Sequence, residues 1–213
     1  MSKILIIRFS ALGDIAMAIP VIYSFARKYP MHEISFLSRK SHLALFTNKP
    51  HNLHLIEADV ENEHKGMCGL FRLYKSLKTY EFDYVADFHS VIRSHFLRLL
   101  FVLSGTKSTR IRKGRYEKWL LTRKFFKVKQ PLASSTERYK QTLKMLQFDF
   151  DYQFETILKP TNEDITKLYQ KVGQKKAMKW IGFAPFSKHE GKIYPLQLQE
   201  KIVSHFASDK RVQ

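Results

Sequence analysis

Hydrophobic positions in the first two thirds of the chain follow two alternating patterns. Short runs of consecutive apolar residues are typical of strands buried on both faces, and they predict strands at 3–8, 33–38, 53–57, 83–88 and 109–112. Apolar residues recur at helical spacing between these runs, which predicts helices over 15–29, 42–46, 70–80 and 90–103. The alternation of strand and helix with short loops predicts an α/β fold, with a parallel sheet flanked by helices.

The pattern is less regular further along the chain. The basic segment 115–129 fits no element, 136–146 is predicted as a helix, and the aromatic segment 148–160 is predicted as an extended linker. A helix is expected over 162–172 with Asn162 as its N-cap, then a strand at 179–183 and a helix from Leu196, with Pro195 in its first turn. We therefore predict one domain over 1–160, and over 161–213 a linker helix and the incomplete start of a second α/β domain.

Composition narrows the class of partner. The 213 residues carry a formal net charge of +18, which attracts nucleic acid, anionic lipid headgroups or phosphorylated substrates. Between 107 and 129 only Glu117 opposes a run of cations, namely Lys107, Arg110, Arg112, Lys113, Arg115, Lys118, Arg123, Lys124, Lys127 and Lys129. A solvated face without a partner is the alternative. Neither zinc-finger spacing nor the aromatic spacing of an RNA-binding sheet is found.

Cysteine content and hydropathy indicate a cytoplasmic location. Cys68 is the one cysteine, so no internal disulfide can form. No uninterrupted apolar run reaches the roughly 18 residues that a membrane-spanning helix needs.

The first candidate site follows the first strand. Ser10-Ala11-Leu12-Gly13-Asp14 leads into the first helix, at the edge of a parallel sheet where ligands bind. Gly13 lets a substrate approach the backbone closely. Asp14 could be a helix N-cap, or a general base held at a rigid helix start. The glycine patterns of dinucleotide-binding and phosphate-binding loops are absent here.

Two further loops carry candidate chemistry. The stretch 183–195 contains Ser187, Lys188, His189 and Lys192 before a helix, a combination that suits a phosphate or diphosphate. The alternative is a solvated basic loop. A second group of candidates follows the fourth strand, where the same cleft could be lined by Asp87, His89, Ser90 and Arg93. In that case Arg93 could bind an acidic acceptor. The alternative is that Asp87 and Ser90 cap the next helix and that Arg93 is solvated.

These segments together resemble glycosyltransferase family 9, the lipopolysaccharide heptosyltransferases. The opening KILIIRFSALGDIAMAIPVIYSFARKYP is similar to the start of that family, with a strand ending in Arg, then Ser-x-x-Gly-Asp and a Pro-containing helix. The segments YVADFHSVIRS, STERYKQTLKMLQF and IGFAPFSKHEGKIYPLQLQEKIV resemble later family segments. The resemblance covers essentially the whole chain.

The resemblance implies a fold of the GT-B type, with two Rossmann-like domains, the second truncated here. It implies inverting, metal-independent transfer of a sugar from a nucleotide sugar, usually ADP-heptose, to a lipid-anchored lipopolysaccharide acceptor, with no cofactor. Asp14 matches the catalytic base, and Ser187 and Lys192 match the contacts to the donor phosphates. Ser10, Gly13, Asp87, His89 and Arg93 are expected to bind the acceptor or line the cleft.

The departures from the family pattern limit what this chain is expected to do alone. Ala184-Pro185-Phe186 replaces the usual Pro-Gly-Ala, Tyr194 replaces the usual Trp, and the family's nucleotide-binding segments have no counterpart. We expect the isolated chain to be inactive, either as a fragment of a longer enzyme or as a truncated, inactive relative. The alternative is a non-catalytic module that binds an acidic lipid or glycan. The expected location is the cytoplasm, peripheral at the inner face of the membrane; nucleic acid binding, supported by charge alone, is the weakest expectation.

Overall fold

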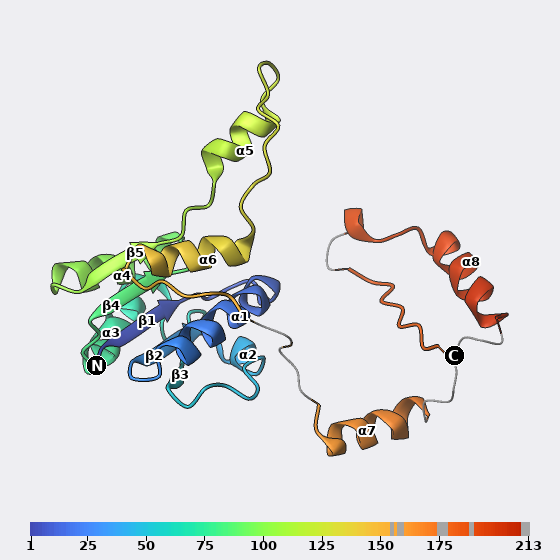
Figure 1. Ribbon diagram of the computed structural model, residues 1–213, viewed down its shortest axis with the longest axis horizontal. Helices are drawn as coiled ribbons and strands as arrows, with labels where there is room; N and C mark the ends of the chain where they lie inside the picture. The colour runs from blue at the N-terminus through green and yellow to red at the C-terminus, as the bar shows by residue number, and fades with distance from the viewer. Residues whose placement is uncertain (154–155, 157–159, 174–178, 188–189, 210–213) are drawn as a thin grey trace. The chain divides into compact units, whose positions relative to one another are not determined.

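The computed structural model describes residues 1–153, 156, 160–173, 179–187 and 190–209 (Figure 1). The chain divides into two compact units, Met1–Lys159 and Pro160–Gln213.

The first unit is built on a five-stranded sheet in which every neighbouring pair is parallel, in the order β3-β2-β1-β4-β5. Its strands are β1 (Lys3–Ile7), β2 (Glu33–Ser38), β3 (Leu53–Glu57), β4 (Tyr84–Asp87) and β5 (Lys107–Arg110). The predicted α/β class is confirmed, and β2 and β3 have the predicted bounds. The chain builds β1 to β3 outward and then returns to place β4 beside β1. The strand order therefore reverses between β1 and β4, the position where open α/β sheets bind ligands.

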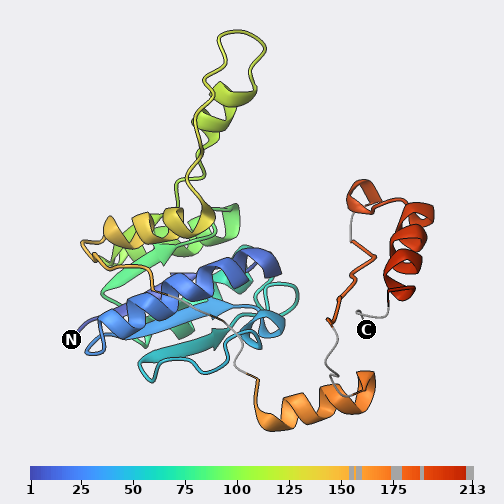
Figure 2. The same ribbon diagram turned by 45° about the vertical axis from the view of Figure 1, so that its right-hand side comes forward.

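Helices cover both faces of the sheet, as Figures 1 and 2 show. On one face, α1 (Leu12–Lys28) and α6 (Ser135–Lys144) pack over Ile4 and Ile6. On the other, α3 (Gly66–Lys78) and α4 (Ile92–Leu103) pack over Leu5 and Ile7. These four side chains of β1 are fully buried, because successive strand residues point to opposite faces and both faces are covered. The short helix α2 (Lys40–Leu43) begins two residues before the predicted one.

Residues 148–150, which we call the aromatic strap, correct the predicted linker. Phe148 and Phe150 are buried, and their rings lie 5.2 and 5.4 Å from the ring of Phe25 on α1. The Tyr29 hydroxyl donates to the Asp149 carbonyl (2.7 Å) and accepts from the Asp149 N–H (3.1 Å). This part of the predicted linker therefore belongs to the core of the first unit.

The basic segment that fitted no element forms an arm, residues 115–131, which projects from the body of the first unit (Figures 1 and 2). It consists of the helix α5 (Arg115–Thr122) and a return segment that leads to α6. Gly114 precedes α5 with φ of 59°, and an added Cβ would come within 2.5 Å of the Arg138 guanidinium. The left-handed backbone therefore favours a glycine where the arm leaves the body.

The second unit contains α7 (Asn162–Val172), the short 3-10 helix η1 (Glu190–Lys192) and α8 (Leu196–Ala207). The predicted N-cap of α7 was wrong by one residue: Thr161 caps the helix by accepting from the Asp164 N–H (3.2 Å), and Asp164 accepts in return from the Thr161 N–H (2.9 Å). Pro195 is the N-cap residue of α8. In the described part of 179–183, only Lys179 makes a strand-type bridge, so the predicted strand does not form there.

Candidate functional site

An ion pair joins the end of β1 to the start of α1. Arg8 follows the last strand residue, and its Nη2 lies 2.5 Å from Oδ2 of Asp14 in the first turn of α1. The Arg8 side chain is 8% exposed, whereas that of Asp14 is 48% exposed. The buried Arg8 guanidinium therefore holds the Asp14 carboxylate at the protein surface, where solvent or a ligand can reach it.

The surroundings of Arg8 fix its position. Its Nη1 donates to the carbonyl of Phe88 after β4, and its guanidinium lies 5.5 Å from the centre of the Tyr139 ring on α6. The Tyr139 hydroxyl donates to the backbone carbonyl of Asp14 (3.2 Å), and its ring stacks on Phe88 at 4.7 Å. Burial raises the pKa of Tyr139 to about 12, so its hydroxyl stays protonated as a donor. Groups from β1, β4, α1 and α6 thus meet around one guanidinium.

Asp14 does not cap its helix. Helix α1 begins at Leu12, its N-cap is Ala11, and no side chain caps it. The N-cap alternative for Asp14 is therefore wrong, although a carboxylate in the first turn still interacts favourably with the helix dipole. An added Cβ at Gly13 would meet no atom within 4 Å, so open space lies beside the Gly13 backbone.

His89 and Ser10 form a second contact between the ends of β4 and β1. His89 Nε2 lies 3.1 Å from the Ser10 hydroxyl, and its Nδ1 faces the Phe9 N–H at 3.5 Å. Burial, together with nearby Arg8 and Lys113, lowers the pKa of His89 to about 4. The imidazole ring of His89 is therefore neutral at pH 7. Because Nδ1 accepts from the Phe9 N–H, the ring hydrogen is on Nε2, and Nε2 donates to the Ser10 hydroxyl oxygen. The Ser10 hydroxyl then keeps its own hydrogen for another acceptor.

Asp87 lies beneath this cluster and is fully buried. Its Oδ1 accepts from the N–H groups of His89 and Ser90, both at 2.8 Å, and its Oδ2 accepts from the Ser94 hydroxyl at 3.0 Å. Asp87 therefore holds the turn between β4 and α4 and does not line an open cleft. The N-cap residue of α4 is Val91, so the alternative in which Asp87 and Ser90 cap this helix is wrong. Arg93 is exposed on α4.

A cavity of about 490 Å³ opens beside the ion pair. The cations Arg8, Lys113, Lys118 and Arg138 and the carboxylate of Asp14 line it, as do Ser134 and Ser135 at the start of α6. Burial and the neighbouring cations Arg115 and Arg8 lower the pKa of Lys113. The cavity therefore carries a positive potential that favours an anionic ligand.

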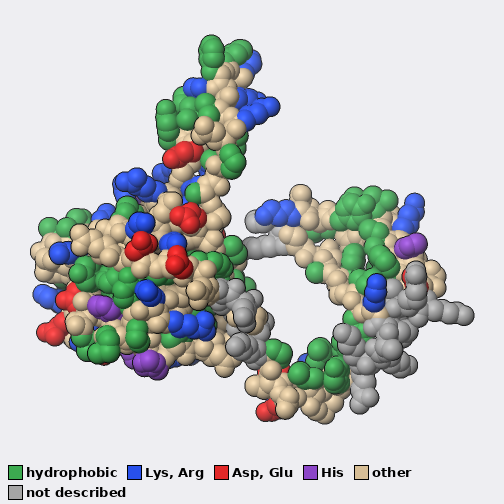
Figure 3. All heavy atoms as spheres, in the orientation of Figure 1, with side chains coloured by type: hydrophobic (Ala, Val, Ile, Leu, Met, Phe, Trp, Pro, Cys, Tyr) green, Lys and Arg blue, Asp and Glu red, His purple; other side chains and the backbone are tan. Residues whose placement is uncertain are grey.

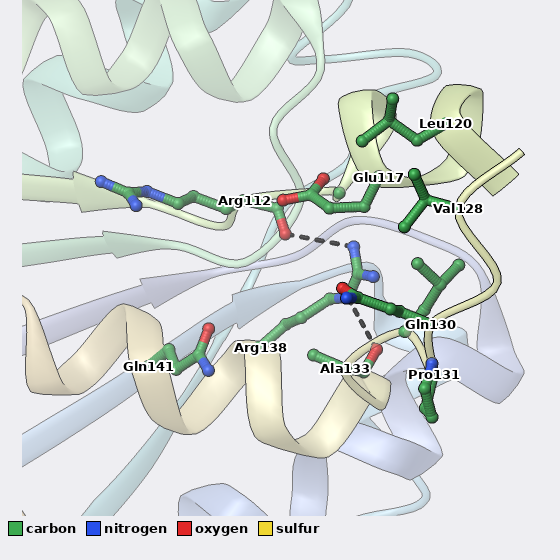
Figure 4. Close-up of a pocket in the computed structure, with 11 residues that line it drawn as sticks. Arg112, Glu117, Leu120, Val128, Gln130, Pro131, Ala133, Arg138 and Gln141 are labelled. Atoms are coloured by element: carbon green, nitrogen blue, oxygen red, sulfur yellow. Dashed lines mark hydrogen bonds between the residues drawn. The ribbon is translucent and has the colours of Figure 1, made fainter. Parts of the chain in front are cut away.

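A second cavity of about 240 Å³ lies at the base of the arm (Figure 4). Arg138 lines both cavities; its Nε donates to the Ala133 carbonyl (2.9 Å) and its Nη1 to the Arg112 carbonyl (3.3 Å). Glu117 and Gln141 also line this second cavity. Arg138 therefore bridges the two segments that flank the arm, one before it and one after it.

The second unit carries the predicted phosphate-binding residues. Ser187 lies in the irregular stretch before η1, and Lys192 is exposed at the end of η1. Lys188 and His189 lie outside the described residues. The structure thus groups Asp14, Ser10, Gly13 and His89 in the first unit, and the donor-side roles of Ser187 and Lys192 stay predictions.

Three cavity or cluster residues were not proposed from the sequence, namely Arg8, Arg138 and Tyr139, whereas Lys113 and Lys118 were named only within the run of cations at 107–129. Arg8 had a usable signal, because an arginine directly after a run of buried strand residues needs a partner. Arg138 and Tyr139 lie about 125 residues after Asp14, and only the packing of α6 on α1 brings them there.

Metal-ligand clusters and membrane-spanning helices were looked for among the described residues. Among the residues that the structure describes, no group of three His, Cys, Asp or Glu side chains is arranged to hold a metal ion. Within the same described ranges, no helix combines the length and apolar character needed to cross a membrane.

Comparison with known proteins places this geometry in context. No protein-family model matches the chain. The lipopolysaccharide core heptosyltransferase OpsX of Haemophilus influenzae is 31% identical over 94 residues, which are 44% of this chain and 26% of that protein.

Solved structures extend the likeness to the fold. A family 9 glycosyltransferase of Veillonella parvula matches with a TM-score of 0.69 and 18% identity, over 96% of this chain and 60% of its own. The Escherichia coli heptosyltransferase WaaC with ADP matches at 0.61 and 14% identity, over 97% of this chain and 65% of its own. The chain therefore spans less than two thirds of these proteins. The resemblance to glycosyltransferase family 9 is confirmed to this extent: the chain is heptosyltransferase-like in sequence over the matched residues and has the α/β fold of these glycosyltransferases.

Proposed function

We propose that this chain supplies the acceptor-binding domain and the catalytic base of a glycosyltransferase of lipopolysaccharide assembly. The donor is a nucleotide sugar, with ADP-heptose as the preferred candidate, since a similar solved enzyme was obtained with ADP-2-deoxy-2-fluoro heptose. The observation that carries the proposal is the Asp14 carboxylate, half exposed and held by Arg8 at the mouth of a cationic cavity.

In this proposal Asp14 removes the proton of the acceptor hydroxyl. As that oxygen attacks the anomeric carbon, a new carbon–oxygen bond forms and the bond to the nucleoside diphosphate breaks on the opposite face, which inverts the configuration. The proton passes to Asp14, and the electron pair leaves with the diphosphate. A base contributes most when it is held within hydrogen-bond reach of the proton, and Arg8 and the rigid start of α1 restrict the Asp14 carboxylate in this way.

The cavity beside Asp14 suits an acidic acceptor. Lys113 and Arg138 line it from segments on either side of the arm, and each can bind a phosphate or carboxylate group of a lipopolysaccharide precursor. Ser10 keeps a hydroxyl hydrogen available near the same edge of the sheet. These groups would orient the acceptor so that its hydroxyl faces Asp14.

Donor binding is assigned to the second unit. Lys192 would neutralise the charge that grows on the leaving diphosphate, and the Ser187 hydroxyl would donate to a phosphate oxygen. With these groups the transfer would need neither a metal ion nor a cofactor. We place the reaction in the cytoplasm, at the inner face of the membrane that holds the lipid-anchored acceptor, and we expect no transfer by the 213 residues alone.

Transfer assays on the product of the complete reading frame containing this chain test the proposal. Asp14→Asn should lower the transfer rate about 10²- to 10⁴-fold while acceptor binding changes little, because the base acts in the transition state. The matched control is Glu61→Gln, which breaks another arginine pair, Arg39–Glu61 at 2.5 Å, away from the cavity. An unchanged rate in Asp14→Asn would rule out Asp14 as the base.

Binding by the 213-residue chain and transfer by the complete product together separate the enzyme from the alternative module. A lipopolysaccharide precursor should bind the wild type, and Lys113→Gln should weaken that binding. If the complete product binds this acceptor but transfers no sugar from any nucleotide sugar, the non-catalytic module is the correct function.

A further inference from the structure

The arm exposes an unusual set of aromatic side chains. Tyr116, Trp119, Phe125 and Phe126 are 66%, 54%, 68% and 88% exposed, although residues of these types usually bury most of their surface. Val128 is also exposed beside them. An exposed apolar group of this kind, concentrated on one projection, indicates an interaction surface.

Cations surround these aromatic rings. Figure 3 shows basic and hydrophobic side chains interspersed along the arm. The basic residues of the arm are Arg115, Lys118, Arg123, Lys124, Lys127 and Lys129, and Glu117 is the acidic residue among them. The partner of this surface must therefore accept aromatic rings and attract cations at the same time.

The end of the arm has a defined conformation. The Val128 N–H donates to the Leu120 carbonyl (3.1 Å), which closes the return segment onto α5. The Arg123 Nε donates to the Phe126 carbonyl (2.7 Å), and its guanidinium lies 5.2 Å from the centre of the Trp119 ring. These contacts use the backbone of Phe126 and leave its ring exposed.

We propose that the arm docks this protein on an anionic lipid bilayer. Aromatic rings favour the boundary between headgroups and acyl chains, and lysines beside them bind the lipid phosphates with their stems along the apolar surface. A narrow projection inserts readily into a fluid surface. Single-stranded nucleic acid instead binds in a basic groove in which aromatic rings form a stacking platform, a shape that a projecting arm does not provide. This attachment deepens the proposed function, on whose membrane location it rests, by naming the segment that meets the lipid surface; the vesicle tests below need no sugar transfer.

The same arm contributes to the cationic cavity. Lys118 of α5 lines the cavity beside Asp14, and Leu120 and Val128 line the second cavity at the base of the arm. Docking of the arm would therefore hold the cationic cavity near the lipid surface. A lipid-anchored acceptor could then reach the cavity without leaving the bilayer.

Vesicle flotation of the 213-residue chain tests the docking. Phosphatidylcholine vesicles with phosphatidylglycerol should bind the wild type more tightly than phosphatidylcholine alone. Phe125→Ser with Phe126→Ser should weaken binding to the anionic vesicles about tenfold or more, at low and at high salt, because apolar burial is lost. The matched control changes two exposed apolar residues of α4, Ile92→Ser with Leu103→Ser, and should bind like the wild type.

A charge variant separates the two contributions. Lys124→Gln, Lys127→Gln and Lys129→Gln together should weaken binding to anionic vesicles at low salt about tenfold or more, and much less at high salt, since salt screens exposed charges. The matched control replaces three exposed lysines of the body, Lys65, Lys75 and Lys78, by Gln and should have a smaller effect.

Tryptophan fluorescence reports the depth of the arm. The chain has two tryptophans, so Trp180→Phe leaves Trp119 as the reporter. Anionic vesicles should shift its emission to the blue, and brominated lipids should quench it.

The proposal would be overturned if the wild type and the double variant (Phe125→Ser, Phe126→Ser) bound anionic vesicles equally well. RNA binding or self-association that depends on Phe125 and Phe126 without vesicle binding would also overturn it. In the product of the complete reading frame, a double variant (Phe125→Ser, Phe126→Ser) that loses docking but transfers sugar normally to a water-soluble acceptor would confirm the docking role and leave the proposed function intact.

Discussion

Two pairs of phenylalanines, about 23 residues apart along the chain, have opposite surroundings. Phe125 and Phe126 lie on the arm, 68% and 88% exposed, whereas Phe148 and Phe150 of the aromatic strap are 8% and 3% exposed. Both pairs belong to segments without clear helical or strand periodicity. The comparison shows that apolar composition alone does not identify the core: a ring contributes to folding only where other elements supply a surface for it.

The surface for the strap is the α1 face of the sheet. The Phe148 ring lies near those of Phe25, Tyr29 and Tyr84, at 5.2 to 5.3 Å. The arm projects from the body, and against the residues that the structure describes Phe125 and Phe126 stay largely exposed. The strap is therefore a structural element, and the arm is available to bind a partner.

The largest predicted effect lies in the strap. Phe150→Ala should lower the free energy of unfolding by about 3–5 kcal/mol, because it removes a buried ring and leaves a cavity against Phe25. Urea unfolding followed by circular dichroism measures this change. A loss below about 1 kcal/mol would show that the strap is a linker, as the sequence suggested, and would remove the contrast with the arm.

The second prediction compares the buried Arg8 with the partly exposed Arg123. Arg8→Met should cost about 2–3 kcal/mol of unfolding free energy, since the Phe88 carbonyl loses its donor and Asp14 loses its partner. The loss of unfolding free energy stays at this level because Asp14 is half exposed, so water can solvate its carboxylate when the Arg8 guanidinium is removed. Arg123→Met on the arm is the control in the same urea titration and should cost less than about 1 kcal/mol. Equal costs would show that Arg8 is no better anchored than an arm residue.

The third prediction concerns pH. The pKa of His89 is about 4 in the folded protein and 6.5 ordinarily, so between these values the unfolded chain binds more protons. Stability should therefore rise with pH across this window and fall as the pH drops from 7 to 5, with His89 contributing about 1–2 kcal/mol.

Comparison with His89→Asn, which keeps an acceptor near the Phe9 N–H, isolates this contribution in urea titrations at the two pH values. His42 and His95 also have lowered pKa values, and their contribution should persist in the variant. An unchanged pH slope in His89→Asn would show that His89 is hydrated, as an arm residue would be.

The smallest effect is expected on the arm itself. Phe126→Ser should change the free energy of unfolding by no more than about 0.5 kcal/mol, because the ring is already in water. The same urea titration as for Phe150→Ala measures it. A loss above about 1 kcal/mol would mean that the ring packs on the protein in solution, and the arm would then resemble the strap.

The sequence by itself determined the α/β class, the parallel sheet and the place of Asp14 after β1. These follow from local rules: consecutive apolar residues form buried strands, apolar residues at helical spacing form covering helices, and parallel strands bring their loops to one edge. The resemblance to glycosyltransferase family 9 rests on the same local stretches.

Tertiary structure alone decided which residues surround Asp14 and which aromatic segment is buried. Arg8 and Tyr139 meet because α6 packs on α1, 125 residues after Asp14. Phe148 is covered and Phe126 is exposed because one segment returns across the α1 face and the other leaves the body at Gly114. Contacts between residues far apart in sequence depend on the packing of whole elements, and no local pattern of apolar and polar residues encodes that packing.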